Sequence, residues 1–261
     1  MRKALLDVIF MSEKRKNTLL LLKDGPQEME YLLGSLDTTR QALLPQIRVL
    51  EEHYLVSHNK ETYELTPIGK LIVKDMAPLT STVDVLDNDI DYWGTHNLGF
   101  IPPHLVNRLD HLRPCSIINP PLMELYDINK DFHKTSVESK ALSLFFTFLY
   151  PNFPEIYSEW IDNVDRIKYI ASKELFERIS SNYKDEFNRY ISTGKFDLFV
   201  YNHDTNFVSF GYNDYCAFFR LLSKTGEYDN KQLICFSSSA VEWTTELYDH
   251  YLKASIPATE L

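Results

Sequence analysis

The sequence predicts a mixed α+β (or α/β) fold, with a small N-terminal part, a connecting helix and a larger C-terminal part. Three observations support this prediction. Hydrophobic residues make up 44% of the 261 residues, which is enough for a packed core. As far as residue 86 the apolar spacing is mostly helical, interrupted by one strand–turn–strand segment. From residue 92 onward, segments typical of strands and helices alternate.

The first two helices are expected over residues 12–23 and 27–33, with Ser12 as the cap of the first. The segment 24–26, Asp-Gly-Pro, is a turn between them. The candidates for the core on these helices are Leu19, Leu20, Leu22, Met29, Leu32 and Leu33.

A third helix is predicted over residues 39–53, capped by Asp37 or Thr38. Pro45 lies inside it and removes one backbone hydrogen bond, which predicts a local kink. Four apolar residues share one face and predict a buried stripe: Leu43, Ile47, Leu50 and Tyr54.

A hairpin and a further helix follow. Residues 55–58 and 63–66 are short strands joined by the turn 59–62. Thr66 then caps a helix that has Pro67 at its first position. Three helices, a hairpin and another helix are the plan of a winged helix-turn-helix domain, which we assign to residues 1–75.

An apolar series continues this last helix past Pro78 on one face. Residues 76–91 are therefore expected to form a connector that also serves as a dimerisation helix, so that the protein is a homodimer. The predicted interface residues are Leu71, Met76, Leu79, Val83 and Leu86.

Residues 92–261 predict a regulatory (effector) domain with roughly four or five strands in a mixed sheet. Strands are expected at 166–171, 196–201, 208–212 and 232–236, with short buried strands or helical pieces at 117–118 and 142–149. Helices are expected at 173–179, 184–191 and 238–253.

The net charge of −10 is unevenly distributed. Residues 1–75 hold 11 basic and 11 acidic side chains, whereas residues 76–261 hold 16 and 26. Because an acidic surface repels nucleic acid, any contact with double-stranded DNA is expected from the neutral N-terminal part.

The cellular compartment is expected to be a reducing cytoplasm. Cys115, Cys216 and Cys235 are odd in number and lack the spacing of a disulfide framework or a zinc site. No apolar stretch is long enough to cross a membrane, and the N-terminus lacks the cleavage pattern of a signal peptide. We expect no membrane partner, no cofactor and no metal.

Several segments together resemble a known family. LLKDGPQEMEYLLGSLDTTRQALLPQIRVLEEHYLV and YELTPIGKLIV are followed by DYWGTHNLGFIPPHLVNRL, FFTFLYPNFPEIYSEWI and AVEWTTELYDHYLKAS. These segments resemble archaeal winged-helix transcriptional regulators of the methanogenesis-regulator type, over nearly the whole chain. The resemblance implies a transcription factor with a C-terminal effector domain. It also implies that the LLPQ segment, with Pro45, belongs to the recognition helix.

The candidate DNA-binding residues lie at the start of the third helix, on its exposed face and at the tip of the hairpin. Arginine pairs with guanine and glutamine with adenine in the major groove, while threonine hydroxyls at a helix start suit a phosphate. The candidates are Thr38, Thr39, Arg40, Gln41, Leu44, Arg48, His58, Asn59 and Lys60.

A second function stays open: a winged-helix module that binds proteins and does not recognise a DNA sequence. The neutral charge of residues 1–75 favours it, because strong DNA binders are usually basic. A clustered basic face made of Arg40, Arg48, Lys60 and the run Lys14–Lys16 would favour DNA instead.

The effector domain predicts binding and not catalysis. It lacks nucleophile, P-loop and dinucleotide motifs, and its histidines (His96, His104, His111, His133) lack metal-ligand spacing. A small-molecule effector is expected to be apolar or planar, unless Arg220 or Arg166 points inward. The candidate ligand-binding residues are Phe146, Phe148, Tyr150, Tyr201, Tyr212 and Arg220.

Overall fold

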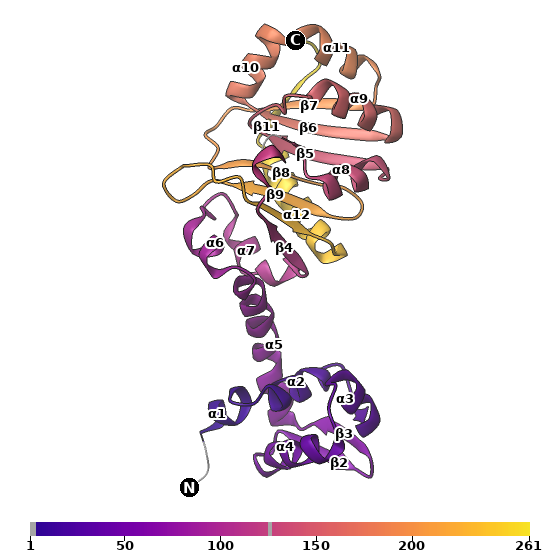
Figure 1. The fold of residues 1–261 in the computed structure, drawn as a ribbon, viewed down its shortest axis with the longest axis vertical. Coiled ribbons are helices and arrows are strands. Elements are labelled where there is room, and N and C mark those ends of the chain that lie inside the picture. Colours follow the sequence, from indigo (N-terminus) through magenta and orange to yellow (C-terminus); the bar gives the residue numbers. More distant parts are fainter. Residues whose placement is uncertain (1–3, 125–126) are drawn as a thin grey trace. The chain divides into compact units, whose positions relative to one another are not determined.

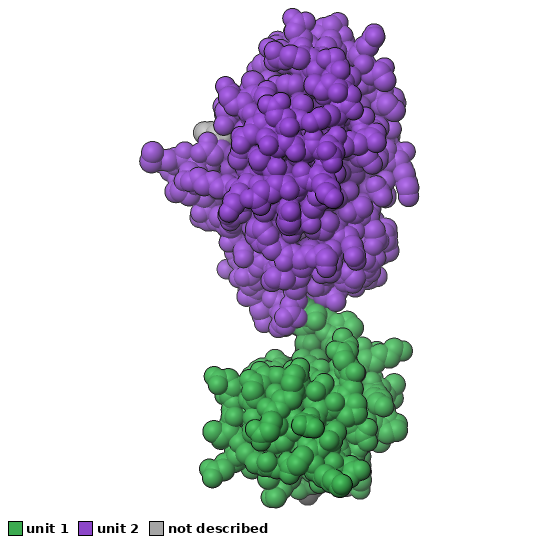
Figure 2. Space-filling model, turned by 90° about the vertical axis from the view of Figure 1, so that its right-hand side faces the viewer, with its two compact units in different colours: residues 1–81 green, residues 82–261 purple. Residues whose placement is uncertain are grey.

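The computed structural model describes residues 4–124 and 127–261. Residues 1–3 and 125–126, which the predicted N-terminal and effector domains include, lie outside the described residues. The chain divides into two compact units, Met1–Ser81 and Thr82–Leu261, shown in different colours in Figure 2. The predicted α+β class is confirmed, and the division falls inside the predicted connector.

The first unit is a winged helix-turn-helix domain, as predicted (Figure 1). Its elements are α1 (Leu5–Phe10), α2 (Glu13–Leu21), β1 (Gln27–Glu28), α3 (Met29–Ser35), α4 (Arg40–Glu52), β2 (Val56–Asn59), β3 (Thr62–Leu65) and the start of α5 (Pro67–Asp87). The three strands are antiparallel, in the order β1-β3-β2. Gln27 and Glu28, predicted as helical, pair instead with Tyr63 and Thr62 on β3.

The start of α4 differs by one residue from the prediction. Thr39 occupies the N-cap position without a side-chain capping bond, whereas Asp37 lies in the left-handed region at φ 42°. The helix continues through Pro45, whose missing N–H leaves the Gln41 carbonyl without its usual helical donor.

The junction between the wing and α5 is tightly packed. Thr66 accepts a hydrogen bond from the Gly69 backbone N–H at 3.0 Å, which confirms the predicted cap. A Cβ atom added at Gly69 would lie 2.0 Å from the Leu55 carbonyl oxygen. Only glycine therefore fits at this crossing.

The core of the first unit joins every one of its helices to the hairpin. Leu43, Ile47 and Leu50 are fully buried, as predicted. Tyr54 was predicted to continue this stripe, and that prediction is wrong because the helix has ended by His53. Tyr54 adopts φ 58°, and its side chain is 58% exposed.

Helix α5 spans Pro67–Asp87 with Pro78 inside it. Two of the five predicted interface residues do not face outward. Met76 is buried in the core of the first unit, and Leu86 packs against a core of the second. Leu71, Leu79 and Val83 are exposed.

The second unit contains an eight-stranded sheet in its described residues, against the four or five strands predicted. Its order is β11-β7-β6-β5-β8-β9-β10-β4, and only β5-β6 and β6-β7 are parallel. The strands are β4 (Cys115–Ile118), β5 (Ala141–Phe146), β6 (Arg166–Ser172), β7 (Phe196–Tyr201), β8 (Phe207–Tyr212), β9 (Ala217–Leu221), β10 (Gln232–Cys235) and β11 (Ser255–Ala258).

Helices cover both faces of this sheet (Figure 1). One face packs against α8 (Lys130–Val137), α9 (Phe153–Asn163), α10 (Lys173–Asn182) and α11 (Lys184–Ser192). The other packs against α6 (Ile90–Thr95), α7 (Pro103–Val106), the 3₁₀ turn η1 (Leu109–Leu112) and α12 (Ser238–Leu252). A short 3₁₀ turn, η2 (Leu122–Glu124), precedes α8. Within the described residues, no helix combines the length and apolar character that a membrane span needs.

Candidate functional site

Helix α4 and the wing tip expose most of the predicted DNA-contacting side chains. The exposed candidates are Thr39, Arg40, Gln41, Arg48, His58, Asn59 and Lys60. Thr38 is partly buried, and Leu44 packs against the core of the first unit. Leu44 thus helps to hold α4 in place, and its contact with DNA stays a prediction.

Arg40, at the first position of α4, forms an ion pair with Glu61 in the turn between β2 and β3. A second carboxylate, that of Glu30 on α3, lies 4.0 Å from its guanidinium. The hydrogen bond from Arg40 to Glu61, and then the attraction between their charges, raise the pKa of Arg40. The start of α4 is thus tied to the tip of the wing by an exposed ion pair.

The wing itself carries a second exposed pair. His58 on β2 contacts the carboxylate of Glu51 on α4, and its ring centroid lies 5.5 Å from that of Tyr63. Lys60 occupies the turn at φ 56°. Two ion pairs therefore connect the wing to α4: Glu61 of the wing pairs with Arg40, and His58 of the wing pairs with Glu51.

The clustered basic face that would favour DNA binding is only partly present. Arg15 donates to the Gln46 side chain at 2.7 Å and to the Val8 carbonyl, and Lys16 pairs with Glu13 at 2.8 Å. Arg15 therefore connects α2 to α1 and α4, and Lys16 pairs within α2. Among the described residues, Lys14, Arg48 and Lys60 form no ion pair.

The second unit has a cavity of about 460 Å³ at the carboxyl end of β5. Two of the six predicted ligand-binding residues, Phe148 and Arg220, line it. The other four are not among its lining residues. Phe146 and Tyr150 are buried in the core on the α9 side of the sheet, and Tyr201 and Tyr212 pack against the α12 side. The aromatic density of the sequence thus reflects two separate cores.

The other lining residues of this cavity were not predicted, among them Arg178 on α10, and Leu222 and Tyr228 from the segment that joins β9 to β10. Their positions depend on the strand order of the sheet, for which the sequence carries no local signal. Arg166, the other candidate for an inward-pointing arginine, lies on the surface and pairs with Asp197 at 2.6 Å.

The described residues contain no group of three or more histidine, cysteine or acidic side chains that could hold a metal ion. His96 is buried, and its two ring nitrogens lie 2.7 Å from the Tyr92 carbonyl and 3.1 Å from the Asp229 carboxylate. Ser237 caps α12, because its hydroxyl oxygen accepts a hydrogen bond from the Ala240 N–H at 3.1 Å.

Two family models match the chain. The model described as "Methanogenesis regulatory protein FilR1, N-terminal domain" matches residues 3–84, and the model of its middle domain matches residues 125–254. The chain belongs to this family. The matched ranges include α4, the wing and the cavity at the carboxyl end of β5.

A curated relative, the methanogenesis regulatory protein FilR1 of Methanothrix harundinacea (strain 6Ac), is 25% identical over 257 residues. The match covers 95% of this chain and 56% of the relative, so the chain spans about half the length of that protein.

Two solved structures are more distant. TrmBL2, described as an archaeal chromatin protein with a novel mode of DNA binding, gives a TM-score of 0.44 at 14% identity, covering 95% of this chain and 94% of its own. The dimethyltransferase RosA of Streptomyces davawensis gives 0.24 at 10% identity, covering 75% and 62%. Neither TM-score is high enough to establish a shared fold.

Proposed function

We propose that this chain is a dimeric, DNA-binding transcriptional regulator whose C-terminal domain, residues 92–261, responds to a ligand or a partner. The observation that carries the proposal is a winged helix whose recognition helix exposes Gln41 and Arg48 beside an exposed wing tip, His58 to Lys60. The family match to methanogenesis regulatory proteins supports it. Arg40, Gln41 and Arg48 contact the major groove, and the wing contacts phosphates or the minor groove.

The ion pair between Arg40 and Glu61 gives this proposal a sharp test. Glu61→Gln removes the nearer of the two carboxylates at Arg40 and takes a negative charge from the proposed DNA-facing surface. We expect two- to fivefold tighter DNA binding, roughly the strength of one exposed pair. The matched control is Glu64→Gln on the neighbouring strand β3, which removes an equal charge that pairs with no arginine among the described residues. Equal effects of the two substitutions, in a fluorescence-anisotropy titration, would contradict a role for Arg40 in binding.

The alternative function, a winged helix that binds protein partners only, is favoured by one observation. The acidic side chains Glu30, Glu51 and Glu61 hold Arg40 and His58, so the face is close to neutral. Under this alternative, neither Glu61→Gln nor Glu64→Gln produces sequence-specific binding at low salt.

The proposed dimer uses the exposed apolar stripe of α5, formed by Ile68, Leu71, Leu79 and Val83. These residues lie on one side of the helix, since their spacing keeps them within about a third of a turn. We expect Leu79→Asp with Val83→Asp to convert a dimer into a monomer in light scattering. Leu122→Asp, at an 83% exposed position outside α5, is the control that should stay dimeric. A dimer that survives the double substitution would place the interface elsewhere.

A further inference from the structure

The cavity of the second unit lies where mixed and parallel α/β sheets commonly bind ligands. In the sheet, strand β5 lies between β6 and β8. The chain passes from β5 to β6, and it reaches β8 only after β7. The crevice at the carboxyl end of a parallel strand, where the connections diverge in this way, is a recurrent binding position. The cavity volume of about 460 Å³ suits a small metabolite.

The lining of this cavity has the opposite charge to the rest of the unit. Its described residues include Arg178 and Arg220 and no acidic side chain. Residues 76–261 as a whole carry 26 acidic and 16 basic side chains. Two arginines without a facing carboxylate form a local positive site that attracts anions.

Arg220 is the unusual member of this pair because it is only 1% exposed. Its Nη2 donates to the Asp127 carbonyl at 2.8 Å, and its guanidinium lies 5.1 Å from the ring centre of Tyr150 and 5.8 Å from that of Phe148. Its Nε–H has no partner among the described residues. Burial of a charged group with an unused hydrogen-bond donor costs free energy, unless an anion accepts that hydrogen bond and balances the charge.

Two further buried polar groups near Arg220 also have no hydrogen-bond partner in the described residues. Ser209 pairs with Arg220 across β8 and β9, so both side chains point to the same face of the sheet. The Ser209 and Tyr150 hydroxyls are both unpartnered. Burial raises the pKa of Tyr150 to about 12, so its hydroxyl keeps its proton and can donate it to an acceptor.

We propose that this cavity binds a small organic anion, a carboxylate or phosphate ester, whose oxygens pair with Arg220 and Arg178 and whose apolar part lies against Phe148. A guanidinium presents parallel N–H groups that match the two oxygens of such a group. The inference rests on the proposed function only in that it names the chemical class of the effector. It agrees with the condition stated from the sequence, under which an inward-pointing Arg220 allows an anionic ligand, because Arg220 is buried and lines the cavity.

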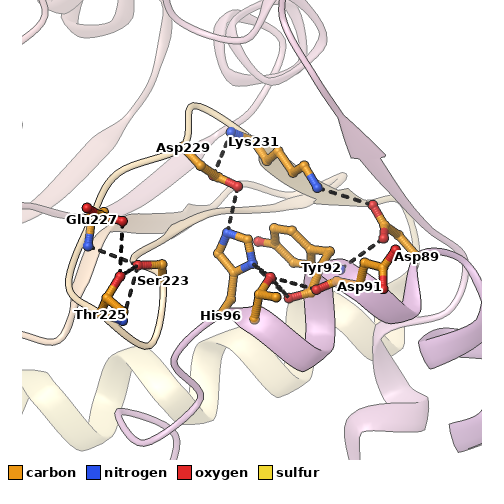
Figure 3. A network of polar contacts seen from close by, with 10 residues as sticks. Asp89, Asp91, Tyr92, His96, Ser223, Thr225, Glu227, Asp229 and Lys231 are labelled. Carbon is orange, nitrogen blue, oxygen red and sulfur yellow. Dashed lines mark hydrogen bonds and ion pairs between the residues drawn. The ribbon is translucent and has the colours of Figure 1, made fainter.

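The same cavity is connected to the end of α5. The segment between β9 and β10 contributes Leu222 and Tyr228 to the cavity wall. Further along this segment, Asp229 contacts His96, and Lys231 lies 3.5 Å from Asp89, which caps α6 (Figure 3). Because α6 follows α5 directly, a ligand that orders this segment also acts on the end of the connector helix.

The test uses the full chain without DNA and three probes of similar size: benzoate, phenyl phosphate and the uncharged benzamide. At about 10 mM probe, a site with a Kd of about 1 mM is mostly occupied, which should raise the melting temperature by about 3–5 °C. We expect this shift with at least one anion and not with benzamide. Comparison of benzoate with phenyl phosphate then tells a carboxylate from a phosphate effector.

Variants test whether anion binding depends on the two arginines of the cavity. Arg178 is exposed, so Arg178→Ala should fold normally and weaken anion binding about tenfold or more in calorimetry. Arg220→Gln should abolish it, and Arg166→Gln, an exposed arginine outside the cavity, should leave it unchanged. If Arg220→Gln fails to fold, Arg178→Ala alone decides.

Equal shifts with benzamide, no shift with either anion, or full anion binding by Arg178→Ala would each overturn the proposal. Because the assay contains no DNA, such a failure would leave the DNA-binding proposal to its own test.

Discussion

The double variant Arg40→Ala/Arg48→Ala is expected to lose specific DNA binding while keeping its fold. Both arginines are exposed on α4, so their removal disturbs no core. Each arginine that reads a base contributes roughly a 5- to 150-fold preference for the correct sequence. Lys60→Ala should act differently, weakening binding to all sequences and lowering the salt slope by about 1, as expected for a phosphate contact. Titration of a specific and an unrelated duplex separates these two effects.

The matched control for this prediction is Arg166→Ala. Like Arg40, Arg166 is an exposed arginine that forms an ion pair, but it lies on β6 of the second unit. It should bind DNA like the unchanged protein. Unaltered operator binding by the Arg40→Ala/Arg48→Ala variant would show that α4 is not the recognition helix.

The second large effect is expected at Gly69, where the wing meets α5. Alanine there places a Cβ 2.0 Å from the Leu55 carbonyl oxygen, so the backbone of either segment has to move. Overpacking of this kind destabilises a domain by about 1–3 kcal/mol. We therefore expect the first unit to unfold more readily, and DNA binding to fall with it.

Gly34→Ala provides the control, because Gly34 lies in α3 and its added Cβ would meet nothing within 4 Å. It should stabilise the first unit by about 0.5–1 kcal/mol. All three tryptophans, Trp93, Trp160 and Trp243, lie in the second unit. Amide hydrogen exchange of residues 40–65 therefore reports the first unit, while tryptophan fluorescence reports the second. If the amides of residues 40–65 were equally protected from exchange in Gly69→Ala and in the unchanged protein, the predicted destabilisation would be contradicted.

The winged helix could be predicted from the sequence because short-range rules determine most of it. Thr66 followed by Pro67 marks the start of α5, and the apolar spacing of Leu43 and Ile47 marks the buried face of α4. The predictions were wrong at residues whose local structure depends on tertiary contacts or on a reversal of the chain. Gln27 becomes a strand only because β3 lies beside it, and Tyr54 turns outward because the chain reverses at a left-handed residue.

The effector domain was predicted less well, for a physical reason. Every residue of β9 is buried, so the strand lacks the alternation that a one-sided strand shows. Helix α9 was not predicted, although its buried residues recur at helical spacing: Phe153, Ile156, Tyr157, Trp160 and Ile161. The residues of the cavity were also predicted only in part. Arg220 could be singled out as a charge in an apolar run, but Arg178 is brought to it only by the sheet order.

The central claim is that the exposed face of α4 and the wing binds a specific DNA sequence. A gel-shift titration of the full chain tests it most directly, with its own promoter region and an unrelated duplex of equal length at about 50 and 200 mM salt. The account predicts tighter binding to the promoter at both salt concentrations, weakened at the higher one by a slope of about −0.9 for each phosphate contacted. Equal affinity for the two duplexes, or no binding at the lower salt concentration, would contradict it.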